Sequence, residues 1–217
     1  MKLQHVSLFA VTIFILAACT FPPPTPMPPP PPTSTPTPPS APSTPIPGMT
    51  CESLDTLLLG KQITVSAPPG NSFQPPTMDI AAHPFTSGNG TITPTGYAKI
   101  ENGGHAGGFA NEINVNNITL SVSIGFGQTL QKVHLSFGEY GGNLNVSINN
   151  NLVNFSNFAD IAGTTIGGAT VNLISGGGGN DKGQIEFTGN MTDQASGLGQ
   201  FSVGGQELYI DDICFTP

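Results

Sequence analysis

Residues 118–124 read Ile-Thr-Leu-Ser-Val-Ser-Ile, and this stretch decides the fold class. Apolar and polar side chains alternate strictly, so in an extended chain they point to opposite faces. The alternation is typical of a β-strand with one buried face and does not fit the 3.6-residue period of a helix. The same pattern recurs over residues 132–137, 143–149, 185–187 and 208–210.

Glycine and asparagine clusters separate these runs, among them Gly141-Gly142-Asn143 and residues 176–180. Such residues supply the positive φ angles that tight connections between antiparallel strands require. Many short strands at this spacing predict an all-β, antiparallel β-sandwich of jelly-roll type. Residues 51–217 have the length of one domain, so we expect a single sandwich there.

The amino-acid composition excludes one class of partner and disfavours two helical fold classes. The 217 residues include 28 Gly, 22 Pro and no Trp, only 8% are charged, and five Lys face thirteen Asp and Glu for a net charge of −8. A nucleic-acid partner is excluded, because phosphate recognition needs clustered Lys or Arg. A coiled coil or helical bundle is disfavoured by the same scarcity of charge.

The N-terminus carries an export signal. Lys2 precedes an apolar run from Val6 to Ala18, and the run ends in Leu16-Ala17-Ala18-Cys19. This tetrapeptide resembles the lipobox of bacterial lipoproteins. The resemblance implies a signal peptide over residues 1–18, a diacylated Cys19, and a cell-envelope protein held on the membrane by lipid with its β domain outside the cytoplasm. The alternative is an ordinary secretory signal or signal anchor in which Cys19 is incidental.

Residues 19–50 follow as a linker. Fifteen of the twenty-six residues from Pro22 to Pro47 are Pro, and most others are Thr or Ser. Because Pro fixes φ and removes a donor, this segment favours extended polyproline II at about 3.1 Å per residue. We interpret it as a disordered, semi-rigid spacer, and a PxxP ligand for a partner groove is the alternative.

The cysteine count supports an extracytoplasmic location. Three Cys are present, and if Cys19 carries lipid, then Cys51 and Cys214 remain. We predict that they form a disulfide joining the two ends of the domain, worth nominally about 4–5 kcal/mol in the chain-entropy account. Two unpaired thiols are the alternative.

The closing stretch, residues 204–215, contains Leu208-Tyr209-Ile210-Asp211-Asp212-Ile213-Cys214-Phe215. It resembles the last strand of secreted jelly-roll modules of the galactose-binding-like type. The resemblance implies a structural Ca²⁺ bound by Asp211 or Asp212, with no other cofactor expected. The alternatives are an exposed carboxylate pair or a hydrogen-bonded bulge, and a bulge would return Ile213 and Phe215 to the core face.

Ligand recognition is predicted at the most polar and aromatic turn. Carbohydrate recognition on β-sandwiches combines aromatic faces with amide and carboxylate hydrogen bonds, which makes Glu139, Tyr140 and Asn143 candidate ligand-binding residues. Ordinary turn chemistry is the alternative for each of them.

Catalysis has little support in this sequence. Neither HExxH nor GxSxG is found, and His105 lies in a glycine-rich loop with no partner that the sequence identifies. We therefore expect no enzyme and no catalytic residues. The predicted function is a lipid-anchored, non-catalytic cell-surface binding module for carbohydrate or another envelope component. A structural or adhesive envelope lipoprotein is the alternative, and a secreted hydrolase is the third hypothesis.

Overall fold

The computed structural model describes residues 46–65, 72–108, 110–124, 129–190 and 197–217. The predicted signal peptide, Cys19 and the linker up to residue 45 lie outside the described residues, and those predictions stay predictions. Within the described ranges no helix has the length and apolar character needed to span a bilayer. The helical structure there is one 3₁₀ turn, η1 (Phe158–Ile161).

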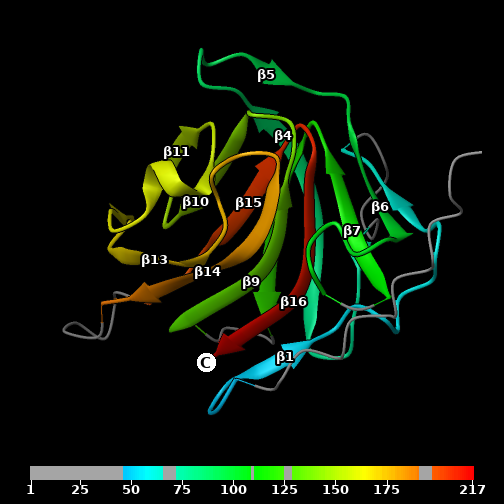
Figure 1. Cartoon of the computed structure of the whole chain (residues 1–217), viewed down its shortest axis with the longest axis horizontal. Coiled ribbons are helices and arrows are strands. Elements are labelled where there is room, and N and C mark those ends of the chain that lie inside the picture. The colour runs from blue at the N-terminus through cyan, green and yellow to red at the C-terminus, as the bar shows by residue number, and fades with distance from the viewer. Residues whose placement is uncertain (1–45, 66–71, 109, 125–128, 191–196) are drawn as a thin grey trace, which may run out of the picture. The chain divides into compact units, whose positions relative to one another are not determined.

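All described strand pairs are antiparallel and form two sheets (Figure 1). The nine-stranded sheet contains, in spatial order, β12 (Thr165–Ile166), β13 (Ala169–Ser175), β14 (Asp181–Gly189), β9 (Lys132–Glu139), β16 (Leu208–Thr216), β7 (Asn111–Asn116), β6 (Tyr97–Asn102) and β2 (Gln62–Ile63), with β1 (Thr50–Glu52) paired to β16.

The seven-stranded sheet lies against it. Its spatial order is β11 (Asn151–Phe155), β10 (Leu144–Ile148), β15 (Phe201–Gly205), β8 (Ile118–Ile124), β4 (Met78–Thr86) and β3 (Ser72–Phe73), with β5 (Ile92–Thr93) paired to β4.

The alternating apolar residues meet between the sheets. Leu120, Val133 and Val146 are among the buried side chains of one core cluster to which both sheets contribute. Successive strands from β7 to β10 change sheets at each step, which wraps the chain around this core. The predicted antiparallel β-sandwich is confirmed.

Strand β9 departs from the predicted pattern, because it is buried on both faces. Alternation places His134 and Ser136 on the outer face, yet each side chain is only 3% exposed. Ser136 lines a small cavity together with Ala106 of the segment that joins β6 to β7, and His134 lies opposite Cys214 of β16. The expected half-exposed strand was therefore wrong here, and at Ser136 the reason is that the loop between β6 and β7 lies over the polar face.

Strand β16 changes partner along its length. Leu208–Ile210 pair with β7, and Ile213–Phe215 pair with β1. A bulge lies between Asp211 and Cys214, with Asp212 at φ 47°. It returns Ile213 and Phe215 to the core, as expected for the bulge that we gave as one alternative at Asp211 and Asp212.

The predicted disulfide is also confirmed. Cys51 of β1 lies directly opposite Cys214 of β16, and their sulfur atoms are bonded across a sequence separation of 163 residues. Figure 1 shows β1 beside the C-terminal end of β16. The first and last strands of the domain are therefore joined both by hydrogen bonds and by a covalent bond.

Candidate functional site

A glycine-rich loop, residues 103–108, connects β6 to β7 and lies on the outer face of the nine-stranded sheet. Two of its residues need glycine for their backbone angles, since Gly104 and Gly107 have φ of 101° and 85°. Gly103 needs it for space, because an added Cβ would collide with the Glu112 carboxylate. The glycines therefore let the loop lie flat enough for His105 to reach the sheet.

His105 is held by a buried carboxylate. Its Nδ1 lies 2.5 Å from Oε1 of Glu112, and the main-chain N–H of Ala106 donates to Oε2 of the same group at 2.9 Å. The Glu112 side chain is 1% exposed, whereas that of His105 is 52% exposed. Glu112 thus fixes the imidazole, and Nε2 is the ring nitrogen left for a ligand.

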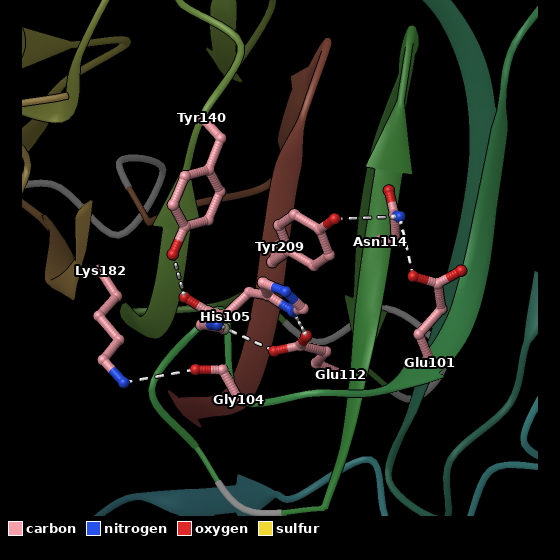
Figure 2. Close-up of polar contacts among 9 residues, drawn as sticks. Glu101, Gly104, His105, Glu112, Asn114, Tyr140, Lys182 and Tyr209 are labelled. Carbon is pink, nitrogen blue, oxygen red and sulfur yellow. Dashed lines mark hydrogen bonds and ion pairs between the residues drawn. The ribbon is translucent and has the colours of Figure 1, made fainter. Parts of the chain in front are cut away.

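Three rings from distant parts of the chain meet at this loop, and we call His105, Tyr140 and Tyr209 the aromatic cluster. His105 stacks on Tyr209 with centroids 4.4 Å apart, and Tyr140 meets both rings edge-on at 6.1 Å and 5.7 Å. The Tyr140 hydroxyl donates to the main-chain oxygen of His105 at 3.1 Å. Figure 2 shows the three rings converging above β16.

A polar chain extends the cluster toward β6. Asn114 Nδ2 contacts the Tyr209 hydroxyl at 3.4 Å and donates to Glu101 Oε2 at 3.0 Å (Figure 2). Lys99 Nζ lies 2.9 Å from the other oxygen of Glu101. The hydrogen bonds from Asn114 and Lys99 lower the pKa of Glu101, and the bond to Glu101 raises the pKa of Lys99. Both groups are therefore charged at neutral pH.

The pKa of Tyr140 and that of Tyr209 are both raised. The larger cause is desolvation by burial, and the smaller cause is the negative charge of nearby carboxylates that include Glu112. The two hydroxyls are therefore neutral at physiological pH. Neutral phenols both donate and accept hydrogen bonds. The cluster thus combines apolar ring surface with uncharged hydrogen-bonding groups.

A shallow cleft of about 420 Å³ opens beside His105 and Tyr140, and Asn180, Asp181 and Lys182 form its other side. Lys182 Nζ donates to the main-chain oxygen of Gly104 at 3.4 Å. The Asp181 carboxylate accepts the N–H groups of Gly177 and Gly178, so it orders the loop before β14. Aromatic surface on one side and hydrogen-bonding groups on the other make this cleft the candidate ligand site.

The three predicted ligand-binding residues, Glu139, Tyr140 and Asn143, do not form one site in the structure. Tyr140 belongs to the aromatic cluster, but Glu139 points into the domain and is 1% exposed. Its two oxygens accept the N–H groups of Phe158 at 2.8 Å and Gly179 at 2.7 Å, and burial raises its pKa. Asn143 lies in the exposed turn, where its Nδ2 donates to Gln206 at 2.8 Å. Glu139 and Asn143 are therefore engaged within the protein.

The Ca²⁺ site predicted at Asp211 and Asp212 stays a prediction. Ca²⁺ needs six to eight oxygens, and the described residues contain no group of three or more His, Cys, Asp or Glu placed to hold a metal. Asp211 Oδ1 accepts the N–H of Asp212 at 2.7 Å. Burial and the neighbouring Asp212 raise the pKa of Asp211 to about 8, which favours the neutral acid.

Sequence reasoning left His105 without a partner and did not single out Asn114. The signal that bears on the loop is Gly138, a glycine inside an otherwise well-formed strand, which indicates close approach of another backbone. A Cβ at Gly138 would collide with the main-chain oxygen of His105. No protein-family model, curated protein or solved structure matches this chain.

Proposed function

We propose that this protein is a lipid-anchored cell-surface module that binds carbohydrate without chemical turnover, and that the aromatic cluster is its binding site. The lipobox-like Leu16-Ala17-Ala18-Cys19 and the proline-rich linker support display outside the cytoplasm. The disulfide between Cys51 and Cys214 is consistent with an oxidising compartment.

One observation carries the proposal. Residues 105, 140 and 209 place three rings on one sheet face, and the His105 ring stays half exposed while the Glu112 that orients it is fully buried. A buried carboxylate is expensive unless it is well satisfied, so its use to fix an exposed ring points to a role for that ring beyond packing. Aromatic C–H surface beside hydroxyl, amide and ammonium donors matches the mixed character of a sugar ring.

The test is a glycan array probed with the full chain in detergent micelles. We expect the wild type to bind a defined subset of glycans and Tyr140→Ala to lose at least tenfold in affinity for them. Lys132→Ala is the matched control, because Lys132 lies at the opposite end of β9, on the same sheet. A blank array would contradict carbohydrate binding and favour the structural or adhesive alternative.

A secreted hydrolase is the second candidate, and the His105–Glu112 contact favours it. A carboxylate that holds Nδ1 and leaves Nε2 for a ligand is the arrangement that orients a histidine general base. A hydrolase would release reducing ends or ester products from a soluble substrate panel, and His105→Gln would abolish that activity. The binding proposal predicts no turnover by the wild type.

A further inference from the structure

The two sheets of the sandwich differ sharply in charge. The strands of the nine-stranded sheet carry eleven Asp, Glu and Lys residues, whereas those of the seven-stranded sheet carry one, Asp79. Strands β8, β10 and β15 direct only Thr, Ser, Asn and Gly to the outer face. Apart from Asp79, which pairs with Ser123, one exposed sheet face of this acidic protein is therefore neutral and rich in hydroxyl groups.

This neutral face is hollowed into a cleft of about 490 Å³, which we call the hydroxyl trough. Ser121, Ser202 and Ser147 lie side by side across β8, β15 and β10, because they pair in register. His83 of β4 lies on one side, and Leu152 of β11 lies on the other and is 44% exposed. The volume falls within the roughly 300–1,000 Å³ of small-molecule sites.

The floor of the hydroxyl trough is ordered before any ligand arrives. Asn145 is fully buried, accepts the Thr119 hydroxyl at 3.2 Å, and donates to the Thr86 carbonyl at 3.1 Å. Gly204 lies between Thr119 and Asn145, and a Cβ there would lie 2.7 Å from the polar atoms of both. The hydrogen bonds of Asn145 fix the floor of the trough, so a ligand would not need to order it.

The long direction of the hydroxyl trough crosses the strands. It extends from β4 over β8, β15 and β10 to β11, which at about 4.8 Å between strands is roughly 19 Å. Such a length exceeds a single sugar ring and suits several linked units. The exposed Leu152 and Pro84 at its two sides supply apolar surface for C–H groups.

We infer that the hydroxyl trough is a second binding site, separate from the aromatic cluster, and that it takes a neutral, extended polysaccharide chain. Its hydroxyl and amide groups both donate and accept, as sugar hydroxyls do. An anionic chain would need Lys or Arg, and none lines the trough. A peptide strand adds to a sheet edge, where backbone groups are unpaired, and finds no such groups on a sheet face.

The test is affinity electrophoresis of the full chain in gels cast with dextran, hydroxyethyl cellulose or soluble starch. We expect retardation by at least one of them and none by an anionic alginate. Ser202→Tyr fills the middle of the trough from an outer-face position, and we expect it to weaken retardation at least tenfold. Thr170→Tyr is the matched control, because Thr170 is an exposed strand residue of the other sheet. Ser121→Gln serves as a second blocking variant if circular dichroism shows that Ser202→Tyr is misfolded.

The outcomes separate this inference from the proposed function. Retardation that survives Tyr140→Ala and disappears in Ser202→Tyr supports the trough, whatever the glycan array gives. Retardation lost in Tyr140→Ala and kept in Ser202→Tyr would overturn it and leave the aromatic cluster as the site. No retardation by any of the neutral polymers would also overturn it, as would a dimer, seen by sedimentation velocity, that Ser202→Tyr dissociates.

Discussion

The main-chain carbonyl of His105 lies so close over Gly138 that β9 has no room for a side chain at this position. The contact joins the loop between β6 and β7 to the outer face of the nine-stranded sheet. Because His105 also stacks on Tyr209 and is held by Glu112, the fit at Gly138 sets the position of the whole aromatic cluster.

We predict that Gly138→Ala displaces the loop, because the new methyl group meets rigid backbone. It should lower the free energy of unfolding by about 1–3 kcal/mol and weaken glycan binding with it. Urea unfolding and the array measure both effects. Gly178→Ala is the control, since the nearest atom to its added Cβ is 4.0 Å away. Equal behaviour of the two variants would show that the contact is unimportant.

A pH dependence follows from Asp211, which faces Asp212, Asp55 and Glu112. Burial, assisted by Asp212, raises its pKa from 3.8 to about 8, so the folded chain keeps a proton that the unfolded chain loses. The resulting stabilisation is complete below about pH 4 and decreases as the pH rises to 8, at up to about 1.4 kcal/mol per pH unit.

Asp211→Asn should remove this contribution, since an amide does not titrate. We expect the difference in unfolding free energy between wild type and variant to change steadily from pH 5 to pH 8, always in the direction that favours the variant more at high pH. Urea titrations at four pH values measure it. A difference that does not change with pH would contradict the raised pKa.

The disulfide gives a third prediction. Cys51→Ser combined with Cys214→Ser should lower the free energy of unfolding by about 2–5 kcal/mol, because the bond closes almost the whole domain into a loop. Wild type in reductant should approach the variant. Two titratable thiols in unfolded, unreduced wild type would show that the bond does not form.

Membrane attachment gives a fourth prediction, which rests on the lipobox resemblance. Cys19→Ala should prevent lipid attachment, so the variant should be found either in the soluble fraction or as a precursor that keeps its signal peptide. Mass spectrometry of the wild type should find fatty acids on Cys19. A wild type whose mature N-terminus carries no lipid would refute the anchor.

The sandwich could be predicted from the sequence because its determinants are local. Alternation at residues 118–124 specifies which side chains enter the core, and the apolar spacing around Asp211 and Asp212 made a bulge one of the alternatives there. The disulfide follows from a count of three Cys. Each of these three inferences can be made without knowing how distant segments pack against one another.

The candidate site depends on packing between distant segments, which alternation does not encode. Glu112 lies on the outer face of β7 among the alternate polar positions, so the pattern predicts an exposed side chain. The loop of residues 103–108 buries it instead. Glu139 lies on the core-facing side of β9 together with Phe137. A carboxylate is accommodated there because the N–H groups of Phe158 and Gly179 donate to it. Such tertiary contacts convert apparent turn residues into buried anchors.

The most direct test of carbohydrate binding at the aromatic cluster uses intrinsic tyrosine fluorescence, which is interpretable because the chain has no Trp and three Tyr. Tyr97→Phe leaves Tyr140 and Tyr209 as the only emitters. Titration of this variant with the glycans selected by the array should give a saturable change in emission, and adding Tyr140→Ala should weaken the affinity at least tenfold. Glycan binding that leaves the emission unchanged, or that is as tight with Ala at position 140, would contradict the proposed site.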